Sequence, residues 1–238
     1  LPSFRNYDVV QLISPYFLHL RSERTLPAYH YLRRFNGKVF LGAFGTDYYY
    51  IRACMETDTY RYSDFKTGNC YRDTDFNKMT LQDWYYGGAA HATRTIAESC
   101  NGIMACLWEY YVAYQLLFPE KTAFVPLPIN LHKIVSRIRT VPEILNFFIG
   151  IQNFKDTVKG TDVMLPVLQE VQRKHPDLCR ITEVHDVPYA RYQQLMDDAD
   201  VQLDQLYSYT PSMNSLLAMA KGVTVVGGGE PENYEILN

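Results

Sequence analysis

No stretch of this 238-residue sequence approaches the roughly 18 consecutive apolar residues that a membrane-spanning helix requires. The N-terminus also lacks the basic, apolar and small-residue succession of a signal peptide. We therefore expect a cytoplasmic protein and leave open a peripheral contact with the inner membrane. An excess of positive charge is missing too, since 23 Lys and Arg stand against 26 Asp and Glu. Without a basic field, binding to nucleic acid is not expected.

Cysteine provides no framework either. The five cysteines are odd in number and scattered, and no two of them form a CxxC motif. This usage is typical of reduced thiols in a cytoplasmic protein and disfavours a disulfide scaffold or a thiolate zinc site. None of the six histidines shows metal-ligand spacing, and Asp198-Ala199-Asp200 is only a weak metal signal, so we expect no metal and no cofactor.

Tyrosine is the residue in excess, with 20 copies against 12 Phe and 2 Trp. Tyrosine joins an apolar ring to a polar tip, which suits clefts that face sugars. For most of these tyrosines, a half-buried place at the edge of a core is the favoured interpretation.

Short apolar runs alternate with helical patterns along the chain. We expect strands at residues 8–13, 38–43, 102–107, 122–125, 145–149, 180–184, 201–203 and 223–226. We expect helices at residues 26–35, 91–99, 108–117, 162–174, 190–197 and 212–221. This alternation predicts an α/β protein with right-handed crossovers. Several strands are apolar on successive residues, as in parallel sheets that are buried on both faces.

The chain divides into two predicted domains. Pro126-Leu127-Pro128-Ile129-Asn130 and the weakly patterned residues 131–140 are typical of a linker, so we assign residues 1–135 and 136–238 to separate domains. Residues 54–88 form a polar, Tyr- and Asp-rich excursion that we expect to be partly helical. Both ends are expected to be cut, because a strand opens the chain without a partner and a helix begins where the chain stops.

The segment 207–232 contains a candidate anion site. Thr210 is suited to cap a helix and Pro211 to occupy its first position, with Gly222 as the residue that ends it. The free amides at Ser212 and Met213 would then meet an anion at the helix N-terminus. The glycines at 227–229 would allow close approach to a ligand. A purely structural role for the same features is an equally good interpretation.

The segment 147–162 carries two lysines at the mouth of the second sheet. A strand ends at Gly150, and a loop with Lys155 and Lys159 leads to a helix that we expect Thr161 to cap. The lysines would neutralise a diphosphate leaving group. A solvated loop is the alternative interpretation.

Three segments, taken in order, resemble a known family. Lys159-Gly160-Thr161-Asp162 follows Gly150, then come Val187-Pro188-Tyr189 with Tyr192, and finally Ala218-Met219-Ala220-Lys221-Gly222. This order resembles the nucleotide-binding half of GT-B glycosyltransferases, chiefly family-4 retaining enzymes and related bacterial polysaccharide-synthesis proteins. The resemblance covers nearly all of residues 145–238 and is weaker in the first domain.

The resemblance implies a GT-B fold of two Rossmann-like domains with parallel sheets facing a central cleft, the first of them incomplete. It implies a hexosyltransferase that moves a sugar from a UDP- or GDP-sugar to a glycan or lipid-linked acceptor, with retention. Together with the motifs above, it gives as candidate catalytic residues Lys155, Lys159 and Asp47. The candidate nucleotide-sugar-binding residues are Gly150, Gly160, Val187, Tyr209, Ser212, Met213, Asn214, Gly228 and Glu230.

Two departures from the family pattern favour a second hypothesis. The paired glutamates of family-4 enzymes fall on Tyr209 and Leu217, and a family histidine falls on Gly45, with Asp47 the nearest polar substitute. A non-catalytic GT-B-like protein that binds a nucleotide or glycan is therefore the alternative. Asp200 and Asp204 would hold sugar hydroxyls or cap local structure. An epimerase is disfavoured, because no acidic and histidine set for proton abstraction is present.

Overall fold

The computed structural model describes residues 3–20, 22–137 and 140–237, which form two compact units. Unit 1 comprises Leu1–Pro126 with Tyr234–Asn238, and unit 2 comprises Leu127–Asn233. The division falls nine residues before the boundary at 135/136 that we placed from the linker composition. Ile138 and Arg139 of that linker, and the terminal residues Leu1 and Asn238, lie outside the described residues.

A four-stranded parallel sheet forms the centre of unit 1, with the order β1-β2-β5-β6. Its strands are β1 (Val9–Leu12), β2 (Lys38–Ala43), β5 (Gly102–Ala105) and β6 (Thr122–Phe124). All four were expected from their apolar runs. Each is joined to the next through helical crossovers, which places the carboxyl ends of the strands at one edge of the sheet.

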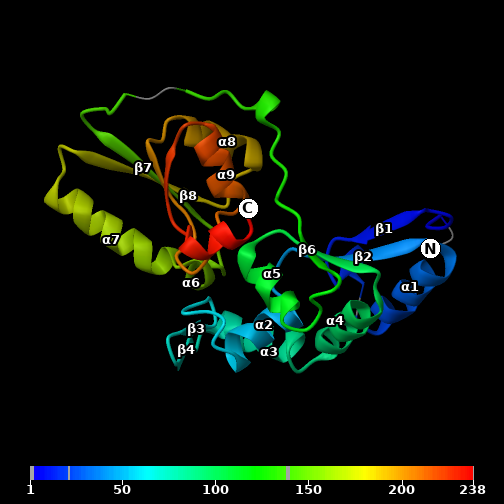
Figure 1. The fold of residues 1–238 in the computed structure, drawn as a ribbon. Helices are drawn as coiled ribbons and strands as arrows, with labels where there is room; N and C mark the ends of the chain where they lie inside the picture. Colours follow the sequence, from blue (N-terminus) through cyan, green and yellow to red (C-terminus); the bar gives the residue numbers. More distant parts are fainter. Residues whose placement is uncertain (1–2, 21, 138–139, 238) are drawn as a thin grey trace. The chain divides into compact units, whose positions relative to one another are not determined.

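Helices cover this sheet and complete its core (Figure 1). They are α1 (Ser22–Phe35), α2 (Tyr48–Glu56), α3 (Asp75–Trp84), α4 (Gly88–Ser99) and α5 (Trp108–Gln115). Tyr29 of α1, Ile96 of α4 and Tyr114 of α5 are almost fully buried in one apolar cluster with the strands. A short 3-10 turn, η1 (Phe17–His19), follows β1. The excursion at 54–88 contains α3 and a hairpin of β3 (Lys66–Thr67) and β4 (Cys70–Tyr71).

The second unit repeats the architecture with the order β10-β9-β7-β8, again all parallel. Its strands are β7 (Leu145–Ile151), β8 (Cys179–His185), β9 (Val201–Leu203) and β10 (Thr224–Val226). Its helices are α6 (Asp156–Lys159), α7 (Thr161–Lys174), α8 (Tyr189–Asp197) and α9 (Met213–Ala220), with 3-10 turns η2 (Leu131–Lys133) and η3 (Pro231–Glu235). Phe148, Leu217 and Ala218 lie in its core.

The predicted helix caps of unit 2 are corrected in two places. Helix α9 begins at Met213 with Ser212 at the cap position, so Thr210 and Pro211 precede the helix instead of starting it. Helix α7 begins at Thr161 itself, and Gly160 occupies the cap position with a φ of 75°. The prediction for Gly222 is confirmed, because it follows α9 with a φ of 79°. Sequence preference for a cap residue identified the region but not the exact position.

Two further features of the chain bear on its environment. No helix among the described residues is long and apolar enough to cross a membrane. All five cysteines are free thiols, and four of them are buried, the exception being Cys70.

Candidate functional site

A pocket of about 250 Å³ opens at the carboxyl edge of the sheet of unit 2. It lies where β7 and β8 end, next to the first residues of α8 and α9. The lining residues are Gly150, Ile151, Gln152, Lys159, Val184, Asp186, Val187, Tyr189, Tyr192 and Asn214. Loops at this edge of open α/β sheets are the usual place for ligands. We therefore take this pocket as the candidate site.

Lys159 supplies a positive charge to the pocket. It is the last residue of α6 and is half-buried. Burial lowers the pKa of its ammonium group, the nearby carboxylate of Asp204 raises it, and the neighbouring charge of Lys155 lowers it, with a net decrease. Lys155 itself is exposed at the start of α6. A desolvated cation of this kind binds an anion more strongly than a fully hydrated one.

Two tyrosines, Tyr189 and Tyr192, also line the pocket. The ring of Tyr192 lies against Gly150 so closely that a Cβ there would stand 2.7 Å from Cε2 of the tyrosine. The same ring meets Phe148 edge-on, with the centroids 5.0 Å apart, which fixes its position in the wall. Tyr189 lines the pocket with 63% of its surface exposed. Position 150 therefore requires glycine, because the ring of Tyr192 occupies the space that a side chain would need.

Asp204 organises the start of α9. This buried residue follows β9, and its Oδ2 accepts hydrogen bonds from the hydroxyls of Ser212 (3.3 Å) and Ser215. Gln205 Nε2 donates to Ser212 Oγ at 3.2 Å. Ser212 is thus held inside this network, whereas Asn214, two residues later, lines the pocket. Of the two roles left open for Asp204, the contacts observed here are those that order local structure. Asp200 is similar, since it accepts from the amide of Asn146 at 2.8 Å.

The glycine loop after β10 packs against the protein's own backbone. A Cβ on Gly228 would lie 2.3 Å from the carbonyl oxygen of Ser208. The amide of Gly228 donates to Gln205 O and the amide of Glu230 to Tyr209 O, both at 3.0 Å. Asn233 Nδ2 also donates to Tyr209 O, at 2.5 Å. Close approach does explain the glycine, and the group that approaches it in this structure is the carbonyl of Ser208. A role of Gly228 and Glu230 in binding a nucleotide sugar remains a prediction.

Asp47 lies in the other unit and caps α2. Its Oδ1 accepts from the amides of Tyr49 (2.9 Å) and Tyr50 (3.2 Å), and its Oδ2 accepts from the hydroxyl of Tyr114 (2.6 Å). The residue is 2% exposed, and burial raises its pKa to about 6 against the opposing effect of these bonds. The bonds account for the aspartate as a structural group, and a catalytic role for it remains a prediction.

The structure brings part of the predicted set together. Gly150, Lys159, Val187 and Asn214 line the pocket. Gly160 lies behind it, where a Cβ would meet Cβ of Leu206 at 2.6 Å, while Tyr209 is buried and Met213 is exposed. Gln152 and Asp186 were missed by the sequence analysis. Each directly follows an observed strand, β7 or β8, which extends past the end that was predicted for it.

The described residues contain no group of three or more His, Cys, Asp or Glu side chains that would hold a metal ion. His185, which precedes the lining residue Asp186, pairs with Glu183 at 2.5 Å. The site therefore consists of one partly desolvated lysine, the carboxylate of Asp186, two tyrosines and the first turn of a helix. This combination is suited to an anionic ligand that also has an apolar ring.

Comparison with known proteins identifies the architecture. No family model and no curated protein sequence matches the chain. Among solved structures, a mutant of S. aureus TarM matches 92% of this chain with a TM-score of 0.55. That structure is a complex with Fondaparinux, alpha-GlcNAc-glycerol and UDP. The fold is GT-B. Sequence identity is 10%, and the chain spans 41% of the length of that protein.

A second GT-B protein is similar over the same extent. The GtfA/B complex bound to UDP and GlcNAc matches 92% of this chain, at 11% identity, and the chain spans 42% of its length. Its TM-score is 0.38, so the assignment of the fold depends on TarM alone. At these identities the comparisons establish the fold, and the activity has to be argued from the site.

Proposed function

We propose that this chain belongs to a glycosyltransferase that moves a sugar from a nucleoside-diphosphate sugar to a glycan or lipid-linked acceptor. The observation that supports this best is the pocket of unit 2. It is lined by Lys159 and by Tyr189 and Tyr192, at the ligand-binding edge of a sheet in the GT-B fold. Both GT-B proteins above were solved with UDP bound.

The chemistry of such a transfer matches the charges of the pocket. The bond between the anomeric carbon of the sugar and the diphosphate oxygen breaks, and negative charge develops on the leaving nucleotide. Lys159, with Lys155 in the same loop and the first turn of α9 at Asn214, would stabilise that charge. Under a retaining mechanism without a protein nucleophile, these groups would supply the main catalytic effect. Retention belongs to this proposal and is carried over from the family-4 resemblance.

One observation favours a second candidate function, the binding of a nucleotide or glycan without transfer. Family-4-like enzymes place glutamates at the positions of Tyr209 and Leu217, and here both side chains are buried, with 1% and 4% exposure. Leu217 packs in the core of unit 2. Neither residue can offer a carboxylate to a donor sugar, so the pocket would bind a nucleotide even where transfer is lost.

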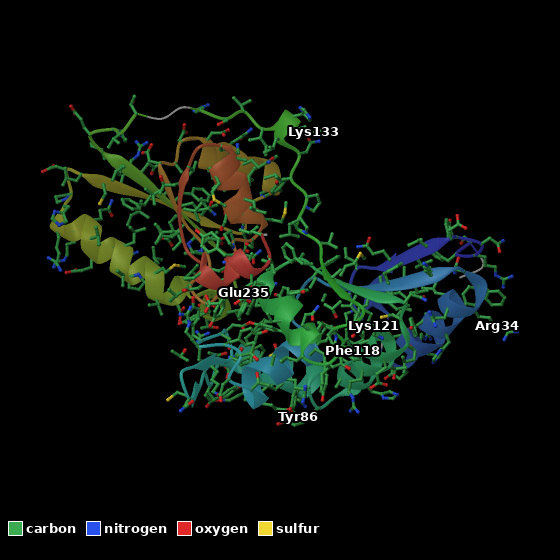
Figure 2. All side chains as sticks on the ribbon, in the orientation of Figure 1. Arg34, Tyr86, Phe118, Lys121, Lys133 and Glu235 are labelled. Carbon is green, nitrogen blue, oxygen red and sulfur yellow. The ribbon has the colours of Figure 1, made fainter. Side chains whose placement is uncertain are left out.

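The deciding experiment measures both binding and turnover. The full-length protein is titrated with UDP and GDP and assayed for hydrolysis and transfer of UDP- and GDP-sugars, with Lys159→Ala beside Lys133→Ala. Lys133 is an exposed lysine of the same unit, outside the pocket (Figure 2). We expect Lys159→Ala to reduce turnover about 100-fold, the usual effect of losing one group that stabilises transition-state charge.

Lys133→Ala should behave as the wild type does. Equal rates for the two variants would remove Lys159 from the mechanism. Binding of UDP or GDP without any turnover would select the non-catalytic candidate, and the absence of both would contradict the proposed function.

A further inference from the structure

Phe154 adopts a conformation that its side chain does not favour. It is the third residue of a four-residue turn that is closed by a hydrogen bond from the amide of Lys155 to the carbonyl of Gln152, at 3.1 Å. Its φ is 65°, in the left-handed region where glycine or asparagine is normally found. The side chain is 89% exposed, so packing against the rest of the unit does not offset this strain. A strained residue of this kind often has a function.

The turn that carries Phe154 is attached to the pocket on both sides. Gln152, which opens the turn, lines the pocket, as does Lys159 at the end of α6. The amide of Asn153, adjacent to Phe154, donates to Oδ2 of Asp186 at 3.4 Å. Asp186 is itself a lining residue with a φ of 40°. Phe154 is therefore one residue away from an amide that bonds to a lining residue, Asp186, which also has a positive φ.

The lining of the pocket includes polar groups that suit a diphosphate, Lys159 and Asn214, and apolar or aromatic groups that suit a base, Val187 and Tyr189. Lys159 and Asn214 would receive the diphosphate, so the base would lie toward Val187 and Tyr189. A base that contacts one exposed tyrosine leaves its other face in water. An aromatic ring on that second face would add a stacking contact that does not depend on which base is present.

We propose that Phe154 is a base-stacking residue. When a nucleoside diphosphate binds, the turn changes conformation and the ring of Phe154 stacks on the face of the nucleobase that Tyr189 does not contact. The inference depends on the proposed function, because it assumes a nucleotide in this pocket. Return of Phe154 to an ordinary φ would release the backbone strain as the stacking contact forms. Binding would therefore be favoured by both changes.

The test compares ligands with and without a base. The full chain, as wild type and as Phe154→Gly, Phe154→Asn and Phe154→Tyr, is titrated calorimetrically with UDP, GDP and inorganic pyrophosphate. Glycine and asparagine suit a positive φ but lack a ring, whereas tyrosine keeps the ring. Leu18→Gly is the matched control, because Leu18 has a φ of 62° in unit 1.

Removal of the ring should weaken UDP and GDP binding about 5- to 100-fold, the range of one stacking contact, and leave pyrophosphate binding unchanged. Phe154→Tyr should retain the wild-type affinity, and Leu18→Gly should not alter it. The thermal midpoint of Phe154→Gly should not fall, since the substitution relieves strain.

Two outcomes would overturn the inference. One is a UDP affinity within about twofold of wild type in both ring-free variants, which lies below the effect of any stacking contact. The other is an equal loss for pyrophosphate, which would mean that the variants disturb the lysine loop. If the wild type bound neither UDP nor GDP, the proposed function would fail together with this inference, whereas nucleotide binding that is indifferent to Phe154 would remove the inference alone.

Discussion

The two units share one architecture but differ in what occupies the carboxyl edge of the sheet. In unit 2 the ends of β7 and β8 leave a pocket with a lysine at its side. In unit 1 the loop after β2 places the buried carboxylate of Asp47 on α2, where protein amides and the Tyr114 hydroxyl bind it. At this edge, unit 2 thus has a pocket lined by Lys159 and Asp186, whereas unit 1 has a buried carboxylate bonded to protein groups.

The carboxyl edge of unit 1 continues into a buried cluster of acids and tyrosines. Asp64, in the excursion after α2, accepts from the hydroxyl of Tyr50 at 2.6 Å, and burial raises its pKa to about 6. Burial raises the pKa of the Tyr110 hydroxyl as well, and the charges of Glu109 and Asp64 add to this effect. Tyrosine is therefore abundant in this protein partly because its hydroxyls solvate carboxylates that water cannot reach.

A ring stack closes the other side of this cluster. Phe118 meets Tyr49 edge-on, with the centroids 5.2 Å apart, and its ring also receives the ammonium of Lys121 at 4.9 Å (Figure 2). Trp108 Nε1 donates to Oε2 of Glu235 at 2.9 Å, which attaches the last residues of the chain to unit 1. The two units thus show that one layer arrangement can position very different groups at the carboxyl edge of its sheet.

The largest effect that would test this contrast is expected from Asp47. Asp47→Ala removes the cap of α2 and leaves the buried Tyr114 hydroxyl without its partner, so we expect unit 1 to lose about 2–4 kcal/mol. Asp47→Asn keeps an acceptor and should cost about 1 kcal/mol or less. Urea unfolding followed by tryptophan fluorescence measures this, because Trp84 and Trp108 both lie in unit 1.

Nucleotide affinity provides the control for both Asp47 variants and should not change. If Asp47→Asn retained full stability yet abolished transfer, Asp47 would instead have the catalytic role that we predicted from the sequence.

The acidity of the two buried carboxyls makes the stability of unit 1 dependent on pH. Asp47 and Asp64 have folded-state pKa values of about 6 against about 3.9 in an unfolded chain. The folded state therefore binds more protons between these values, and stability falls as pH rises through 6. We expect unit 1 to lose roughly 2–3 kcal/mol per carboxyl between about pH 4 and about pH 7.5.

The same tryptophan signal in urea, recorded across this pH range, measures that loss. Asp64→Asn, which lacks one of the two titrating groups, should reduce the pH dependence by about half. A stability of unit 1 that increases toward neutral pH would contradict the assignment.

The glycine loop of unit 2 gives a smaller effect that separates packing from ligand binding. Gly228→Ala would bring a Cβ to 2.3 Å from Ser208 O and should destabilise unit 2 by about 1–3 kcal/mol. Gly229→Ala has no neighbour within 4 Å and should be close to neutral. Calorimetric unfolding distinguishes the two variants. If the two variants had equal thermal midpoints and Gly228→Ala lost UDP affinity, the glycine loop would instead be part of the ligand-binding site.

The smallest expected effect concerns the pocket of unit 2. Because burial lowers the pKa of Lys159, the pocket should lose its positive charge at a lower pH than an ordinary lysine would. UDP affinity should therefore fall several-fold toward alkaline pH, and binding should take up protons, as calorimetry in two buffers would show. Lys159→Arg, which stays charged, should remove the dependence. An affinity independent of pH in the wild type would show that the lysine does not contact the anion.

The strands and helices of both units could be predicted from the sequence more completely than the residues that line the site. All eight strands of the two parallel sheets were predicted, because each is a short apolar run next to turn residues, whereas the β3–β4 hairpin was not. Helix α2 was missed, since its Tyr-rich sequence resembles that of the polar excursion that follows. Asp47 was interpreted as catalytic because an aspartate after a strand can cap a helix or face a ligand, and local sequence does not distinguish these.

The pocket itself depends on which loops meet at the edge of the sheet. Lys159 and Gly150 were predicted from their motif, and Tyr192 was noted beside them. Gln152 and Asp186 carry no motif, and they reach the site because β7 and β8 are neighbours that end together, with Ile151 opposite His185. Register between distant strands is decided by packing of the whole unit, so it could not be read from a single segment.

Gly160 has an implication for how this protein changes through evolution. It ends α6 and begins α7 with a φ of 75°, and any side chain there would also collide with Leu206. Backbone geometry and packing each exclude substitution independently, while the adjacent Lys159 depends on this turn for its position. Homologues should therefore lose the lysine before they lose the glycine. A relative that has Gly160 but not Lys159 would be one that kept this fold and lost the ability to bind the ligand.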